Sequence, residues 1–234
     1  MEGDFVNGLI EVVIRVAETV SAWPGAVALL PAMPTWGLAL IALGGLWLCL
    51  WRRRWRLWGA LGIAAGLMTL GLIRPPDVLV DGRGKLLAVR TADGSLAVSS
   101  MRAAGFSRQV WHRRAGREDS PLVWPRHGLS QDGRLSCDGL GCIYRARGLT
   151  VALVGHPAAL ADDCRVADVV VSTVPVRRPC PSAERVVDRF DLWREGGHAL
   201  WLDGGRVRVE SVDSGRGERP WVVRPEGAGK GRRR

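Results

Sequence analysis

Residues 45–62 read GLWLCLWRRRWRLWGALG, and this stretch decides how the amino-terminal part of the chain folds. An apolar run lies on each side of a short basic cluster, and neither run, 35–51 or 57–73, carries a charge. Each run has about the length that a helix needs to cross a hydrocarbon layer of about 30 Å at about 1.5 Å per residue. The stretch therefore predicts a two-span transmembrane helical hairpin over residues 35–73.

The basic cluster between the two runs predicts how this hairpin is oriented. Its members are Arg52, Arg53, Arg54 and Arg56. Arginines in a short loop are retained on the cytoplasmic side of a membrane, and tryptophans favour the headgroup layer. We therefore interpret the arginines as topology anchors and the lipid bilayer as a partner. This orientation predicts a multi-pass inner-membrane protein whose carboxyl-terminal region is periplasmic. For the arginines, the alternative is contact with DNA. For the apolar runs, the alternative is a pair of buried core helices.

Composition separates the chain into two regions. Its 234 residues carry a net charge of +10, with 47% hydrophobic residues and 11 Trp against a single Tyr. This combination is typical of a basic nucleic-acid binder or of a membrane protein with basic flanks. The long apolar runs lie within residues 1–73, whereas residues 77–234 are polar and rich in Gly and Arg. The Arg74-Pro75-Pro76 sequence marks the boundary.

The first segment, residues 1–34, predicts an amphipathic helix followed by a proline-rich linker. Polar residues at helical spacing within residues 5–22 share one face, and Glu11 and Arg15 are four residues apart. Such a helix lies at a membrane interface or packs on other helices. A secretory signal peptide is excluded, because the segment begins with acidic residues and its apolar run is interrupted by charges.

Residues 77–223 predict a β-rich soluble domain, with residues 224–234 as a basic, disordered tail. Asp-Gly turns between short β-branched runs indicate hairpins. Residues 182–195 read as a helix that begins at Ser182, so we expect an α+β domain with a mostly β core. The expected strands are 77–80, 86–90, 95–99, 134–137, 142–147, 149–155, 168–175, 198–202 and 206–211.

Four of the five cysteines lie in this second region, and they indicate disulfide bonds. They are Cys137, Cys142, Cys164 and Cys180. An even number of cysteines fits a domain in an oxidising compartment. Cys137 and Cys142 flank a turn and so could bridge a hairpin, but four cysteines allow three pairings. Free thiols and a zinc site are the alternatives.

Catalytic motifs are absent from the sequence. The four histidines are scattered singly, and neither a nucleophile elbow nor a phosphate-binding loop occurs. We therefore predict no catalytic residue, no metal site and no cofactor. If the chain were a divergent metal-dependent phosphodiesterase, its first candidates for metal ligands would be His156, Asp162 and Asp163.

One basic segment, residues 102–117, predicts contact with nucleic acid. It interleaves cationic side chains with an aromatic ring, a composition that follows a phosphate backbone and stacks on bases. The candidate residues are Arg108, Trp111, Arg113, Arg114 and Arg117. A coding bias toward arginine, without any function, produces a similar surface.

Several separate segments resemble, in the same order, the carboxyl-terminal part of ComEC family proteins of the alphaproteobacterial kind. The resemblance covers nearly all of the chain, from about residue 5 to about residue 223. The segments that carry it are PGA (24–26), RPPDVLVDGRGKLLAVR (74–90), CDGLGCIYR (137–145), ADVVVS (167–172) and VVDRFDLWREGGHALWL (186–202).

This resemblance implies a role in natural transformation. ComEC proteins form an inner-membrane channel for single-stranded DNA, and many end in a metallo-β-lactamase-like domain. The metal-binding signature of that domain is absent here, so the resemblance implies a non-catalytic domain. The chain would then be a fragment, half of a split protein or a remnant, with other channel segments or competence proteins as partners. A divergent metal-dependent nuclease and a membrane-anchored interaction domain without a DNA role are the alternatives.

Overall fold

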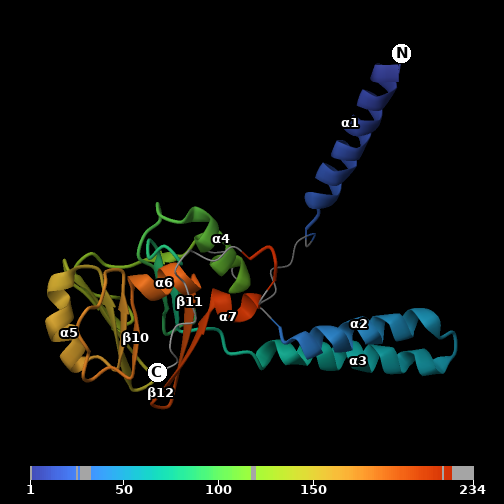
Figure 1. The fold of residues 1–234 in the computed structure, drawn as a ribbon. Helices are drawn as coiled ribbons and strands as arrows, with labels where there is room; N and C mark the ends of the chain where they lie inside the picture. The colour runs from blue at the N-terminus through green and yellow to red at the C-terminus, as the bar shows by residue number, and fades with distance from the viewer. Residues whose placement is uncertain (1, 25, 27–32, 117–119, 218, 223–234) are drawn as a thin grey trace.

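The computed structural model describes residues 2–24, 26, 33–116, 120–217 and 219–222, and its ribbon is shown in Figure 1. The expected tail, residues 224–234, and most of the linker that precedes residue 35 lie outside the described residues. The described chain comprises an amino-terminal helix, a pair of antiparallel helices and a body of two β-sheets.

The amino-terminal helix α1 (Glu2–Ser21) projects away from the rest of the chain (Figure 1). Its apolar residues, such as Leu9 and Val13, are exposed. Glu11 and Arg15 lie on the polar face as an i, i+4 pair, with 3.7 Å between Oε1 and Nη2. The amphipathic pattern of the sequence is therefore present on a helix.

The helical hairpin consists of α2 (Thr35–Leu50) and α3 (Leu57–Met68), which run side by side as a finger that extends from the body (Figure 1). A short 3₁₀ turn, η1 (Arg54–Arg56), joins them, and η2 (Thr69–Gly71) follows α3. The Nε1–H of Trp47 donates to the carbonyl of Trp55 at 3.0 Å and closes the turn. The hairpin is therefore built where the sequence predicts it.

The prediction that this hairpin crosses a membrane twice is wrong. Among the described residues, no helix combines the length and the apolar character that a membrane span requires. The backbone becomes extended at Trp51, which ends α2 after 16 residues, and α3 ends after 12. At about 1.5 Å per residue these helices are about 24 Å and 18 Å long, whereas the hydrocarbon layer is about 30 Å thick.

The first sheet of the body has the strand order β12-β11-β1-β2-β3-β4. Its neighbours pair antiparallel, except that β3 and β4 are parallel. The register places Val80 of β1 opposite His198 of β11, so segments far apart in the sequence become neighbours. The strands are β1 (Val78–Val80), β2 (Leu87–Arg90), β3 (Leu96–Val98), β4 (Leu122–Val123), β11 (His198–Asp203) and β12 (Arg206–Ser211).

The second sheet has the order β10-β9-β8-β7-β6-β5. Strands β8, β9 and β10 are parallel, and the others are antiparallel. Every residue of β9 is buried, as the continuous apolar run in the sequence indicates. The strands are β5 (Gly128–Leu129), β6 (Leu135–Cys137), β7 (Gly141–Ala146), β8 (Leu149–Val154), β9 (Val169–Ser172) and β10 (Arg185–Val187).

The two sheets share one apolar core, to which β1, β2 and β11 contribute from the first sheet and β7, β8 and β9 from the second. Helix α4 (Gly105–Arg114) packs against the first sheet, and α5 (Leu160–Val166) packs against the second. The fold class expected from the sequence, α+β with a transmembrane hairpin, is therefore corrected. The described chain is α+β with two mixed sheets, and the transmembrane part is overturned.

One helix begins later than the sequence indicates. The expected helix over 182–195 is the strand β10 followed by α6 (Arg189–Glu195). Asp188, not Ser182, is the N-cap, because its carboxylate accepts from the backbone N–H groups of Phe190 and Asp191 in a capping box. The described elements are completed by η3 (Pro157–Ala159) and α7 (Val212–Arg216).

Candidate nucleic-acid-binding groove

A groove of about 560 Å³ lies between α4 and the β11–β12 hairpin, above the first sheet. We call it the α4 groove. Its lining comes from four separate parts of the chain, which are residues 73–82, strands β2 and β3, helix α4, and residues 197–212. The pairing of β1 with β11 brings the first and last of these parts together. The groove is therefore a product of the sheet topology.

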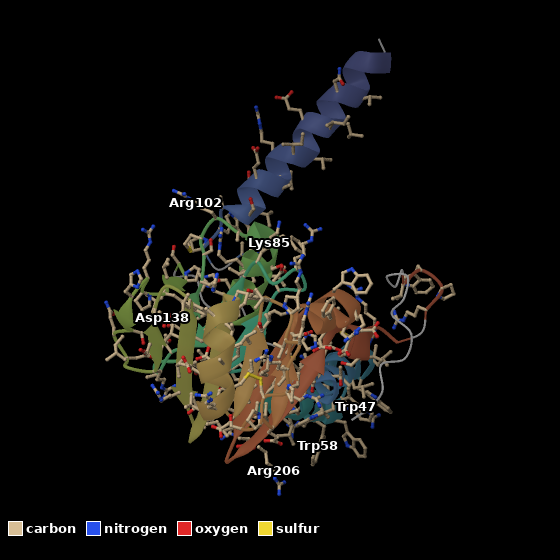
Figure 2. The ribbon with its side chains drawn as sticks, turned by 60° about the vertical axis from the view of Figure 1, so that its left-hand side comes forward. Trp47, Trp58, Lys85, Arg102, Asp138 and Arg206 are labelled. Atoms are coloured by element: carbon tan, nitrogen blue, oxygen red, sulfur yellow. A yellow bond between two sulfur atoms is a disulfide. The ribbon has the colours of Figure 1, made fainter. Side chains whose placement is uncertain are left out.

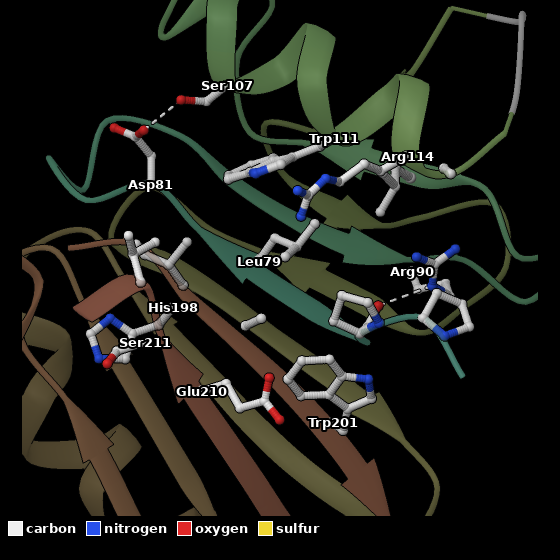
Figure 3. A pocket seen from close by; sticks show the side chains of 18 of the residues that line it. Leu79, Asp81, Arg90, Ser107, Trp111, Arg114, His198, Trp201, Glu210 and Ser211 are labelled. Carbon is white, nitrogen blue, oxygen red and sulfur yellow. Dashed lines mark hydrogen bonds between the residues drawn. The ribbon is translucent and has the colours of Figure 1, made fainter. Parts of the chain in front are cut away.

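Helix α4 forms one wall and presents a single face to the groove. Ser107, Trp111 and Arg114 lie three or four residues apart on this helix, so they share one side of it. Trp111 packs against the apolar cluster on this sheet, which includes Leu86 and Val98. The hydroxyl of Ser107 donates to Asp81 Oδ1 at 2.7 Å, which ties the helix to the end of β1 (Figure 3).

Strand β11 forms the other wall and contributes a second indole. Figure 3 shows Trp201 across the groove from Trp111, with Leu79 between them. The Nε1–H of Trp201 donates to the carbonyl of Arg74 at 2.9 Å, which fixes the ring plane. The guanidinium of Arg208 lies over the same ring, with its Cζ 4.2 Å from the ring centroid, a cation–π contact.

Guanidinium groups outnumber carboxylates in the lining. Arg74, Arg90 and Arg114 line the groove, against Asp81 and Glu210. Arg90 is held by hydrogen bonds from Nε to the carbonyl of Pro76 at 3.0 Å and from Nη1 to the carbonyl of Gly94 at 2.6 Å. Asp81 accepts a hydrogen bond from Ser107, and Glu210 lies 3.7 Å from Arg208 Nε, which offsets the charge of Glu210.

The structure brings two of the five predicted nucleic-acid contacts into this groove. They are Trp111 and Arg114. Arg108 instead donates from Nη1 to the carbonyl of Met101, a contact that holds the start of α4. Arg113 is exposed and is not part of the lining, and Arg117 lies outside the described residues.

Sequence analysis missed Trp201 and Arg90, which line the groove, and Arg208, which lies over the Trp201 ring. The alternation in residues 198–202 predicts a strand, and it gives no indication that this strand lies beside residues 77–80. Only the register of β1 against β11 brings Trp201 and Trp111 to the same groove.

The four arginines predicted as topology anchors lie together at the tip of the hairpin, and all are exposed. Trp47 and Trp51 stack near them, with 5.2 Å between ring centroids. Figure 2 labels Trp47 and Trp58, and Figure 1 shows that the hairpin, which carries them, extends from the body. The tip is therefore a cationic and aromatic surface that is separate from the α4 groove.

The cysteines of the body are bonded in two pairs. Cys137 and Cys142 lie directly opposite each other on β6 and β7 and are joined. Cys164 of α5 is joined to Cys180, which precedes β10. Cys49, on α2, is a free and exposed thiol.

Two of the three residues that a rearranged metal site would use have other partners. His156 Nδ1 accepts from the N–H of Ala158 and so caps η3, and Asp162 lies 3.9 Å from Arg165 Nη1. Burial, with the charges of Asp138 and Asp162, raises the pKa of Asp163. Among the described residues, no group of three or more His, Cys, Asp or Glu side chains is arranged to hold a metal ion.

Comparison with protein-family models, with curated proteins and with solved structures finds no match for this chain. Its functional interpretation therefore rests on the α4 groove and on the resemblance in the sequence.

Proposed function

We propose that this chain is a ComEC-like protein that takes part in the uptake of single-stranded DNA, and that its α+β body holds the strand in the α4 groove without cleaving it. The observation that carries this proposal is the pair of indole rings, Trp111 and Trp201, that line one groove together with guanidinium groups. Stacking of bases on aromatic rings beside cations is how single strands are bound without sequence preference.

A single strand fits this groove better than a duplex does. The bases of a duplex are stacked on one another, so an indole can stack only on a base that is free of its neighbours. Arg114, which lines the same groove, carries a charge suited to pairing with a phosphate, whereas Arg74 is already paired with Asp203. The resemblance to a family that imports single strands agrees with this preference.

The proposal also concerns where the body works. Both disulfides of the body, Cys137–Cys142 and Cys164–Cys180, are of the kind that persists in an oxidising compartment. We therefore assign the body to the periplasmic side of the inner membrane, where it would meet DNA before import. Other segments of the channel, or other competence proteins, are the partners that this role requires.

The test measures binding of the full chain to a fluorescent oligothymidylate by anisotropy. Trp111→Ala and Trp201→Ala are each expected to weaken binding roughly 5- to 150-fold, because stacking on one base contributes about 1–3 kcal/mol. Trp193→Ala is the matched control, since this exposed indole on α6 is not part of the groove lining. If all three variants bind alike, the groove is not the binding site.

Salt dependence tests the contribution of the cations. Arg114→Gln is expected to reduce the slope of log affinity against log salt by about 0.7, the value for one phosphate contact on a single strand. Arg178→Gln is the control, because Arg178 is exposed and not part of the groove lining. Absence of any affinity for the oligonucleotide at low salt would instead favour an interaction domain without a DNA role.

A further inference from the structure

The α2–α3 hairpin exposes many large apolar side chains. The residues of α2 and α3 that are buried are glycines, two on each helix. Leu40, Ile41, Leu48 and Ile63 are half-buried, whereas most of the other large residues of the two helices are exposed. Those that are more than half exposed include Leu38, Leu43, Leu46, Leu50, Leu57 and Leu61. An exposed apolar surface of this extent marks an interaction site.

The two helices approach closely at their glycines, where backbone atoms and a few side chains, such as Ile41 and Leu48, make the contact. A Cβ added at Gly59 would lie 2.4 Å from the carbonyl oxygen of Gly44, and one added at Gly66 would lie 2.8 Å from that of Gly37. Such close approach through small residues is how helices associate where the surroundings are as apolar as leucine. The packing of the hairpin therefore fits lipid surroundings, since it buries little apolar side chain that water would otherwise solvate.

The tip of the hairpin has the composition of a membrane interface. Four exposed arginines lie there, and residues 35–73 include no acidic residue. Trp47, Trp51, Trp55 and Trp58 surround them, and all four are exposed. Tryptophan favours the headgroup layer, and basic clusters are attracted to anionic lipids. Charge complementarity thus selects an anionic lipid surface, because a second copy of the hairpin would bring like charges together.

The base of the hairpin is part of the α4 groove. Residues 73–76 continue from η2 and line the groove. Arg74 Nη1 pairs with Asp203 Oδ1 at 2.7 Å, and the carbonyl of Arg74 accepts from Trp201. A surface that holds the hairpin therefore also holds the groove close to it.

We propose that the α2–α3 hairpin embeds in an anionic lipid surface, with its arginine tip among the headgroups, and thereby keeps the α4 groove beside that surface. The proposal concerns contact with lipid and requires no helix to cross the bilayer. It also does not depend on what the groove binds.

Cys49 gives a direct readout, because it is the free thiol of α2 and is exposed. The full chain, labelled at Cys49 with an environment-sensitive fluorophore, is mixed with phosphatidylcholine vesicles that contain or lack phosphatidylglycerol. Lipid contact is expected to shift the emission to shorter wavelength and to reduce quenching by iodide, most strongly with phosphatidylglycerol. Unchanged quenching would overturn the proposal. Protection that appears without vesicles and grows with protein concentration would also overturn it, in favour of a second copy.

Two sets of variants sharpen the test. Leu43→Glu and Leu61→Glu add charge to the exposed surface of α2 and α3, and they are expected to abolish flotation with vesicles. Leu129→Glu, at an equally exposed leucine on β5, is the matched control and is expected to float normally. Arg53→Gln is expected to weaken binding to anionic vesicles about fivefold and to leave binding to neutral vesicles unchanged. Flotation of Leu43→Glu and Leu61→Glu equal to that of Leu129→Glu would contradict the proposal.

Co-flotation of a fluorescent oligothymidylate separates this proposal from the proposed function. Trp201→Ala is expected to float but to bring less oligonucleotide with it, whereas Leu43→Glu is expected to leave both in the dense fraction. If the protein floats and no variant changes the oligonucleotide, the lipid proposal holds and the DNA function fails. If the oligonucleotide binds the protein but neither floats, the lipid proposal fails alone.

Discussion

The hairpin and the two-sheet body are both rich in apolar residues, and they use them in opposite ways. In the body, large side chains such as Leu200 and Tyr144 are fully buried between the sheets. In the hairpin, most leucines are exposed, and the residues that are buried in α2 and α3 are glycines. The body is therefore stabilised by removing apolar surface from water, whereas the hairpin leaves that surface for a partner. Apolar content alone does not tell where a core lies.

The largest expected effect is the difference in stability loss between a leucine substitution in the body and one in the hairpin. Leu200→Ala removes a fully buried side chain from the shared core, so we expect the free energy of unfolding of the body to fall by about 2–5 kcal/mol. Leu43→Ala, at a leucine that is 64% exposed, is expected to change it by less than about 0.5 kcal/mol. Urea unfolding followed by near-UV circular dichroism measures both. Similar losses for the two variants would mean that the hairpin packs on the body.

A second prediction compares two adjacent glycines of α2. An added Cβ at Gly44 would lie 2.6 Å from the carbonyl oxygen of Gly59, whereas Gly45 has no neighbouring atom within 4 Å of that position. Gly44→Ala is therefore expected to cost the hairpin about 1–3 kcal/mol, and Gly45→Ala to stabilise it by up to about 1 kcal/mol. Hydrogen exchange of the α2 and α3 amides reports the local stability. Equal protection in both variants would show that the helices do not touch through Gly44.

Much of the hairpin could be predicted from sequence, because its signals are local. Two charge-free runs around four arginines fix two helices and a turn, and short β-branched runs between Asp-Gly turns fix most strands of the body. The length of the helices could not be read in this way, because the extended backbone at Trp51 and the 3₁₀ turn after Met68 shorten them. The transmembrane prediction failed on those few residues.

The residues of the α4 groove could be predicted from the sequence only in part. The basic segment identified Trp111 and Arg114, since an aromatic ring among cations is a local pattern. Trp201 lies on β11, which pairs with β1 although the two strands are far apart in the sequence. The residues around Trp201 give no indication of this pairing. Likewise, the helix expected over residues 182–195 is shorter, because residues 185–187 form a strand and α6 begins at Arg189.

A third prediction concerns how helices begin in the two regions. The carboxylate of Asp188 caps α6 and also accepts from the N–H of Val176, whereas α2 and α3 begin without a side-chain cap. Asp188→Ala is therefore expected to destabilise the body by about 0.5–2 kcal/mol. Asp162→Ala is the control and is expected to have almost no effect, because its carboxylate is 88% exposed and only loosely paired. Thermal unfolding measures both, and equal melting temperatures would refute the role of the cap.

The smallest expected change in unfolding free energy at neutral pH concerns Tyr144, a buried titratable residue of the body. Its hydroxyl donates to the carbonyl of Arg90 at 2.7 Å, and burial raises the pKa of Tyr144 to about 12. In the unfolded chain the pKa is near 10, so this tyrosine contributes its full stability below pH 10 and loses it as the pH rises toward 12.

Tyr144→Phe is therefore expected to cost about 0.5–1.5 kcal/mol at pH 7, the value of one hydrogen bond, and to remove part of the alkaline decline. The difference in unfolding free energy between wild type and variant should then narrow between about pH 10 and pH 12, because only the wild type has this phenol to titrate. Urea unfolding at a series of pH values tests this expectation. A constant difference across that range would show that the phenol is not held neutral by burial.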